Sequence, residues 1–256
     1  MNRIVILILL AVLVYYVLIQ DLFFISPRGN FTFLTRDDTS SFFVKDVDGY
    51  VESMNDLDVL AQGCKTKLEF LDRISKAADN FTLKEKWKCK KACTYADDWI
   101  RSQMAQYPGI ENQKLANIPW KLSLTRGKAN EEGLPHTRRD IIFLSDQVLE
   151  LSPRELARTL VHEKIHVYER MFPADLEIWM QANGYKRYKR QSEWSNARSN
   201  PDVDGWVYLR PDGKPTVVLY TTDNPTSIDD VVYPGPQHPN TEHPFETLAY
   251  LVDSTM

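Results

Sequence analysis

One segment near the middle of the chain constrains the fold more than any other, because both of its ends are marked. Ser152 is followed by Pro153 and Glu155, which together form a helix N-cap, a proline at the first helical position and a capping box. Pro173 stops a helix that reaches it. Apolar residues between these signals cover much of a helical circumference, so the sequence predicts a central, well-buried helix over residues 153–171.

The same segment contains His162-Glu163-Lys164-Ile165-His166, which has the pattern HExxH. A helix has about 3.6 residues per turn, so the two histidines share a face and both imidazoles can reach one metal ion. Glu163 lies beside them, where it can act on a bound water molecule. The alternative is a packed pair of histidines around an ordinary glutamate. With only five histidines in the chain, chance produces the pattern in roughly one case in a hundred.

A catalytic zinc site usually has three protein ligands, so two histidines do not complete it. The best third candidate is Glu246, because Pro244 predicts a helix from there to about residue 252 and places Glu246 in its first turn. His243 is the alternative, and one of the two can bind the metal while the other orients it or meets the substrate. We favour Glu246 because a helical carboxylate is held more rigidly than a loop histidine, although a helix N-terminus also favours a carboxylate for its dipole.

Together these residues resemble the zincin metallopeptidases, and within them the gluzincin-like group, in which HExxH lies on one helix and a glutamate ligand comes from a later helix. The resemblance covers roughly residues 140–256 and rests on both histidines and Glu163 of the pattern and on Glu246. The chain does not follow the metzincin pattern, which needs glycine and histidine where this sequence has Glu169 and Phe172.

The resemblance implies an α+β, zincin-like domain that binds Zn²⁺ through His162, His166 and Glu246 and hydrolyses a protein or peptide substrate. Glu163 is expected to take a proton from the attacking water and to pass it to the leaving amine. A catalytically inactive, membrane-anchored binding protein and a purely structural zinc site remain as alternatives. The oxyanion also needs a hydrogen-bond donor, for which the sequence leaves four candidates: Tyr220, Tyr233, His238 and His243.

The N-terminus predicts where the chain is located. Residues 4–19 contain no charge, and after two polar residues the apolar character resumes through residues 22–25. About 20 apolar residues cross a bilayer, so we expect a transmembrane signal anchor. Arg3 favours a cytoplasmic N-terminus, with the remaining chain lumenal or extracellular. A cleaved signal peptide and secretion are the alternative, but no small-residue cleavage pattern follows the apolar run.

The length of 256 residues favours one well-cored domain with an appendage. The net charge of -4 argues against a nucleic-acid surface, and the short basic run 186–190 is expected to be a solvated stretch. The predicted organisation is an anchor (1–25), a membrane-proximal spacer or edge strand (26–48) and a metallopeptidase domain (49–256), with a helical part (50–107) and a catalytic part (135–256).

Three cysteines, Cys64, Cys89 and Cys93, predict one disulfide and one free thiol in an oxidising compartment. Asn30 and Asn80 begin glycosylation sequons, which are usable only if the domain enters a secretory lumen.

Periodicity and capping signals predict the remaining elements. They are an antiparallel pair of helices, over about 51–77 and from Thr82 onward, a strand over 140–144, a helix over 175–182 and a hairpin of 206–209 with 217–220.

Overall fold

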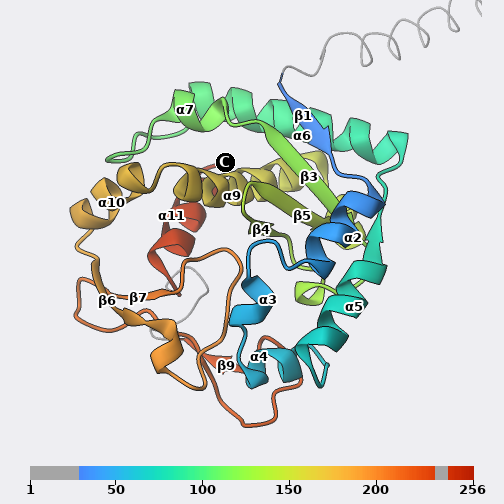
Figure 1. Cartoon of the computed structure of the whole chain (residues 1–256). Helices are drawn as coiled ribbons and strands as arrows, with labels where there is room; N and C mark the ends of the chain where they lie inside the picture. The colour runs from blue at the N-terminus through green and yellow to red at the C-terminus, as the bar shows by residue number, and fades with distance from the viewer. Residues whose placement is uncertain (1–28, 234–241) are drawn as a thin grey trace, which may run out of the picture.

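The structure, a computed structural model, describes residues 29–233 and 242–256 (Figure 1). Five strands form its central sheet: β1 (Phe31–Phe33), β2 (Ala78–Asp79), β3 (Trp120–Thr125), β4 (His136–Arg138) and β5 (Ile141–Ser145). The strand order is β1-β3-β5-β4, and β2 pairs with the end of β3. β1, β3 and β5 are parallel, whereas β2 and β4 run antiparallel to their partners. The fold is therefore mixed α+β, as predicted.

The two faces of the sheet belong to two different cores, because neighbouring residues of a strand point to opposite sides. The covering helices are α2 (Arg36–Val44), α5 (Lys67–Ala77), α6 (Leu83–Ser102) and α9 (Pro153–Met171). Leu122, Ile142 and Leu144 pack in the core that contains α6 and α9. Ile141 and Phe143 pack in the other core, against apolar residues of α2 and α5.

The central helix α9 has the bounds that the sequence predicts. Ser152 caps it, the Ser152 hydroxyl and the Glu155 side chain form the capping box, and Pro153 is its first residue. Its buried side chains include Leu156, Leu160 and Ile165, each with no exposed surface. α9 packs against α6 on one side and against α11 (Pro244–Asp253) on another, so it lies at the centre of the molecule as expected.

The N-terminal part of the domain starts earlier than the sequence suggests. From Phe31 onward, the region predicted as spacer or edge strand is integrated into the fold, because β1 is the edge strand beside β3 and α2 packs against α5. The anchor expected over residues 1–25 lies outside the described residues. Among residues 29–233 and 242–256, no helix is long and apolar enough to cross a membrane.

The predicted antiparallel pair of helices is wrong. The first stretch is divided into α3 (Tyr50–Ser53), α4 (Asp56–Ala61) and α5, because the Asn55 capping box and the Thr66 N-cap each begin a new helix. α5 then packs against α2, while α6 packs against α9. The segment between α5 and α6 forms β2, and the exposed Asn80 follows it, with its side-chain oxygen accepting a hydrogen bond from the Arg36 N–H at 2.9 Å.

The predicted strand β5 and the predicted helices α10 (Pro173–Ala182) and α11 are confirmed within a few residues. The predicted hairpin is only partly correct. Its turn forms, since the Arg210 N–H donates to the Lys214 carbonyl at 2.8 Å, but its two strands pair elsewhere. β7 (Trp206–Leu209) pairs with β6 (Lys186–Arg190), the exposed basic run, and β8 (Leu219–Tyr220) pairs with β9 (Val231–Val232). The other described elements are α7 (Asn112–Ala116), α8 (Asp146–Glu150) and the 3-10 turns η1 (Glu131–Gly133) and η2 (Gln191–Glu193).

The predicted disulfide is absent, because all three cysteines are free and buried. Cys64 belongs to the core that α2 and α5 cover, whereas Cys89 and Cys93 lie on α6 in the core on the other face of the sheet. The sheet therefore separates Cys64 from its two expected partners.

Candidate metal centre

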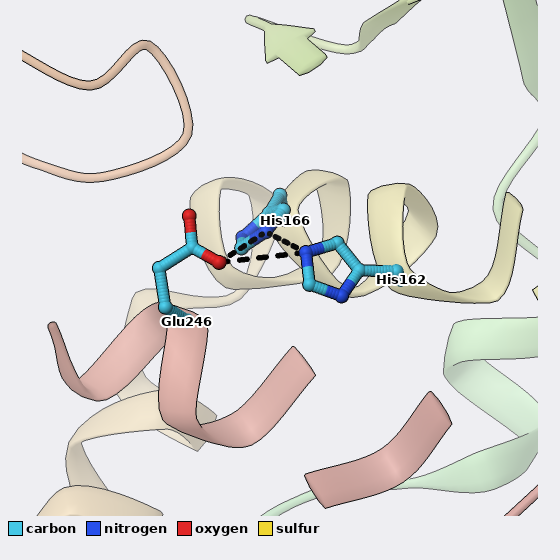
Figure 2. A group of neighbouring side chains, drawn as sticks. All are labelled: His162, His166 and Glu246. Carbon is cyan, nitrogen blue, oxygen red and sulfur yellow. Dashed lines mark hydrogen bonds and ion pairs between the residues drawn. The ribbon is translucent and has the colours of Figure 1, made fainter. Parts of the chain in front are cut away.

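His162, His166 and Glu246 meet where α9 packs against α11 (Figure 2). The two histidine Nε2 atoms are 3.2 Å apart. Oε2 of Glu246 lies 3.4 Å from Nε2 of His162 and 3.8 Å from Nε2 of His166. His166 has no exposed surface and Glu246 is 5% exposed. The structure thus brings together the three residues predicted as metal ligands.

These distances fit a tetrahedral metal site. Zinc bonds to histidine nitrogen and carboxylate oxygen of about 2.0–2.2 Å place neighbouring ligand atoms of a tetrahedron about 3.3 Å apart. The three measured separations, 3.2, 3.4 and 3.8 Å, form nearly such a triangle. The donor set of two imidazoles and one carboxylate also suits zinc, although other divalent transition metals accept the same ligands.

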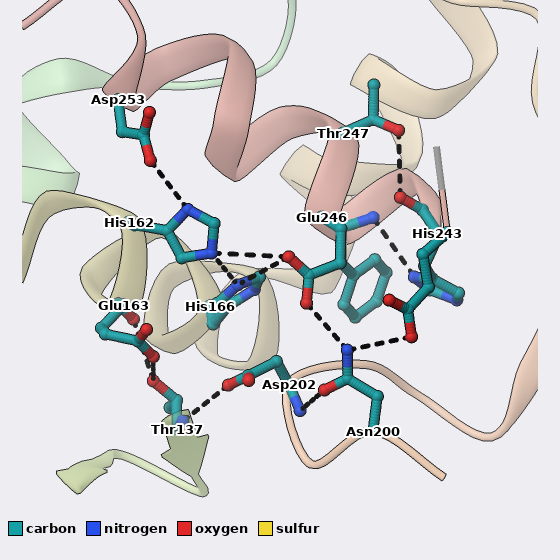
Figure 3. Close-up of polar contacts among 12 residues, drawn as sticks. Thr137, His162, Glu163, His166, Asn200, Asp202, His243, Glu246, Thr247 and Asp253 are labelled. Carbon is teal, nitrogen blue, oxygen red and sulfur yellow. Dashed lines mark hydrogen bonds and ion pairs between the residues drawn. The ribbon is translucent and has the colours of Figure 1, made fainter. Parts of the chain in front are cut away.

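Two further carboxylates fix how the histidines present their nitrogen atoms, and Figure 3 shows the one beside His162. Nδ1 of His162 is 3.0 Å from Asp253, and Nδ1 of His166 is 2.8 Å from Glu169. When Nδ1–H donates to a carboxylate, the neutral ring keeps its lone pair at Nε2. Two lone pairs and the carboxylate of Glu246 then face one another, an arrangement that a bound cation stabilises.

The carboxylate of Glu246 is held from its other side as well. Asn200 donates to Oε1 of Glu246 at 2.9 Å and to Glu242 at 3.2 Å, and Glu242 in turn accepts two bonds from Arg198. Burial favours the neutral acid, but the neighbouring His166 and His162 hold the pKa of Glu246 at about 2. Glu246 is therefore an ionised ligand in a fixed orientation.

Glu163 lies beside this triangle and contacts β4. Its carboxylate accepts a hydrogen bond from the Thr137 hydroxyl at 2.9 Å, and its side chain is 2% exposed. Burial raises the pKa of Glu163 to about 7, against the opposing effect of His162. A carboxyl group with a pKa near neutrality can both accept and return a proton.

His243 does not join the metal ligands. It is the N-cap of α11, where its Nδ1 accepts from the Phe245 N–H at 3.2 Å, and its Nε2 lies 3.2 Å from the Trp206 carbonyl. In the structure the alternative third ligand therefore lies apart from His162 and His166, because its ring caps α11. Tyr220 is also turned away, since its hydroxyl is bonded to Asp58 at 3.1 Å.

The centre opens into a cleft of about 620 Å³, whose lining includes His162, Glu163 and Glu246. Tyr233, one of the predicted donors, also lines this cleft, whereas His238 lies outside the described residues. Tyr250 was not predicted. It lines the cleft from α11, one helical turn after Glu246, and its ring centroid is 4.6 Å from that of His162.

The free edge of β4 is covered at Thr137. The Thr137 N–H donates to the Asp202 carboxylate at 2.5 Å, and the Thr137 carbonyl accepts from Arg170 at 3.2 Å. The segment that contains Asp202 thus covers the edge strand, a common protection of exposed strand edges. At Thr137 the strand has no backbone group left for pairing with another chain.

Sequence reasoning missed four residues that support the centre. Glu169 and Asp253 each have a local signal, because Glu169 is three residues after His166 and Asp253 is two helical turns after Glu246. Thr137 and Asn200 have no such signal, because they lie on a strand and a loop far from α9 in sequence. Comparison of the chain with family models, curated proteins and solved structures finds no match.

Proposed function

We propose that the chain is a zinc-dependent metallopeptidase of the zincin type, anchored to a membrane by its N-terminal segment. The observation that carries this proposal is the triangle of His162, His166 and Glu246, with Glu163 beside it and a cleft in front of it. A structural zinc site is closed by four protein ligands, whereas a catalytic one keeps a position open. Since His162 and Glu246 line the cleft, a catalytic site is the better interpretation.

Zinc bound by these three residues would supply a Lewis acid and a water molecule with a pKa lowered toward about 7. Glu163 takes the proton of the water that attacks the scissile carbonyl, and then delivers it to the leaving amine. Thr137 positions Glu163 for both transfers through its hydroxyl, which donates at 2.9 Å.

Tyr250 is our candidate for the donor that stabilises the oxyanion. Its ring lies against that of His162, and it lines the cleft beside the metal ligands. Burial raises the pKa of Tyr250, so its hydroxyl keeps its proton at neutral pH and is able to donate a hydrogen bond. Tyr233 lies in the wall of the same cleft and is the second candidate.

Glu163→Gln tests the proposal, because the amide keeps the shape of the side chain but accepts no proton. We expect the variant to retain bound zinc, measured by mass spectrometry of the metal, and to lose cleavage of an unfolded protein such as denatured casein. Glu150→Gln, at an exposed glutamate of α8, is the control and should keep full activity. A chelator should abolish cleavage by the unaltered chain, and added zinc should restore it.

Full peptidase activity of zinc-loaded Glu163→Gln would show that this assignment is wrong. An unaltered chain that binds zinc but cleaves neither casein nor a library of random peptides would instead support the inactive, membrane-anchored binding protein.

A further inference from the structure

The outer face of α6 carries a row of exposed apolar side chains. Leu83 is 87% exposed, Trp87 is 42% exposed and Tyr95 is 47% exposed. Trp87 is one turn after Leu83 and Tyr95 is two turns after Trp87, so at about 100° per residue the three side chains lie within about 120° of the helix circumference. The opposite side of α6 is buried in the core, with Cys89, Cys93 and Ala96 fully covered. An exposed row of large apolar residues on a helix that is otherwise well packed requires an explanation.

Lysines surround this row. The five lysines of α6 are Lys84, Lys86, Lys88, Lys90 and Lys91. The Lys91 ammonium lies 3.9 Å from the ring centroid of Trp87. Lys88 is tied to the Leu149 carbonyl. Glu85 is paired with Arg126 at 2.9 Å, and the exposed Asp98, one turn after Tyr95, is paired with Arg101 at 3.7 Å, so both acidic residues near this face have a cationic partner. The result is an apolar row with a positive border.

The chain enters the described domain directly at α6. A Cβ atom at Gly29 would lie 3.8 Å from the carboxylate of Asp97 on this helix. The ammonium groups of Lys86 and Lys90 lie 5.8 and 6.0 Å from the ring of Phe33 in β1, which runs beside α6 in Figure 1. The apolar N-terminal sequence ends at residue 25, and four residues reach at most about 14 Å. A membrane that holds the N-terminal sequence is therefore close to α6.

We propose that the outer face of α6 lies on the surface of the membrane in which the N-terminal segment is anchored. Trp and Tyr are the residues that favour the bilayer interface, and lysine chains extend past apolar surface to place their charge among lipid phosphates. Leu83, Trp87 and Tyr95 enter the interface, and Lys84 and Lys91 contact the headgroups. The short tether makes this contact intramolecular, so weak attraction is enough.

This orientation also decides from which side substrate reaches the cleft, a consequence that rests on the proposed function. Lys164 points from α9 toward α6, where its ammonium bonds to Asp97 at 2.6 Å. His162 and His166 lie on the opposite side of α9, since each is two residues, or about 200° of helical rotation, from Lys164. The cleft thus opens away from the membrane, and its substrate is a polypeptide that arrives from the aqueous phase.

Fluorescence quenching by brominated lipid tests the contact in the full chain, reconstituted in nanodiscs of phosphatidylcholine. The emission of Trp87 is the difference in fluorescence between the unaltered chain and Trp87→Phe. Brominated phosphatidylcholine should remove most of this emission. The control is Trp206→Phe, because this partly exposed tryptophan belongs to β7, a strand that lies away from α6 in Figure 1. Emission from Trp206 should be unchanged by the brominated lipid.

A second variant tests the contact at another residue of the row while Trp87 stays in place as the reporter. Leu83→Glu should reduce the quenching of Trp87, because it places a charge in the interface. Leu68→Glu, at a residue of α5 that is 77% exposed, should leave quenching unchanged. Quenching of Trp87 no greater than that of Trp206 would overturn the proposal, whether the segment is anchored or cleaved. The measurement uses no peptidase activity, so its failure is distinct from a failure of the proposed function.

Discussion

At the scale of single residues, the carboxylates behind the histidines are as informative as the ligands. Asp253 and Glu169 each accept from an Nδ1 atom, and each is buried to at least 95%. Such partners fix the tautomer and the ring orientation of a histidine ligand. A zinc site with these partners is organised before the metal arrives, which lowers the cost of binding.

Asp253→Asn should lower the affinity for zinc about 10–100-fold, because an amide oxygen is a weaker acceptor for the Nδ1–H of His162. Competition with a chromophoric chelator measures this affinity. Asp253 also bonds Arg158 at 3.0 Å, so Arg158→Ala is the matched control, which removes that ion pair and leaves the contact with His162. Equal affinities for Asp253→Asn and the unaltered chain would rule out this role for Asp253.

Glu246 and His243 give opposite expectations for metal binding. Glu246→Ala should abolish stoichiometric binding of zinc, because two imidazoles alone leave the metal exposed to water. His243→Asn should bind one zinc per chain, since asparagine is also a good N-cap for α11. Metal analysis after dialysis distinguishes the two. Loss of zinc from His243→Asn with retention by Glu246→Ala would reverse our assignment of the third ligand.

At the scale of elements, α9 is held against α6 by a buried ion pair. Lys164 and Asp97 are 1% and 2% exposed, and the ammonium also lies 4.1 Å from the ring centroid of Trp120. Burial lowers the pKa of Lys164 and raises that of Asp97, so each group is ionised mainly because the other is present. Such a pair adds little stability, but removal of one partner is costly.

Lys164→Met should destabilise the fold by about 3–5 kcal/mol at neutral pH, because it leaves the Asp97 carboxylate buried without its cation. Lys121→Met is the control. Lys121 pairs with Asp140 at the surface, and its loss should cost about 0–1 kcal/mol. Urea unfolding of both variants measures the difference, and similar costs would contradict the importance of the buried pair.

The loss of unfolding free energy in Lys164→Met should depend on pH. A carboxyl whose pKa is raised in the folded state binds protons there more tightly than in the unfolded state, so its contribution to stability falls as the pH rises above about 3.9. The difference in unfolding free energy between Lys164→Met and the unaltered chain should therefore be smaller at about pH 5 than at about pH 7.5. A difference that grows toward acid pH would mean that Asp97 is not the group responsible.

Elements with complete local signals could be predicted from the sequence, and those that depend on distant partners could not. α9 has a cap, a first-turn proline and a stop, and its predicted bounds agree with the structure. β7 has an equally clear strand pattern, but its partner strand is β6, and the segment after its own turn meets it only at the bridge of Leu209 with Pro215. Glu246 was predictable from Pro244, whereas Asn200, which orients it, comes from a loop without a pattern.

At the scale of the whole molecule, the sheet decides the state of the cysteines. Cys64 is buried on one of its faces and Cys89 and Cys93 on the other, so counting cysteines could not show that they are separated. Burial also raises the pKa of Cys89 to about 12, which makes this thiol unreactive at neutral pH. A count of cysteines therefore does not predict a disulfide when the cysteines lie in different cores.

Thiol titration should therefore find three free thiols in the chain unfolded without reductant and almost none in the folded chain. The reagent can be a chromogenic aromatic disulfide, and the same chain unfolded after reduction is the control. One thiol in the unreduced, unfolded chain would mean that a disulfide forms and that the cores are arranged differently.

The central claim is that His162, His166 and Glu246 form one zinc site, and crystals of the zinc-loaded full chain test it most directly. Diffraction collected on both sides of the zinc absorption edge locates the metal without reference to the protein atoms. We predict one anomalous peak, about 2.0–2.2 Å from Nε2 of both histidines and from a carboxylate oxygen of Glu246. No peak at these atoms, or a peak between His243 and Asp204, whose side chains lie 3.3 Å apart, would contradict the account.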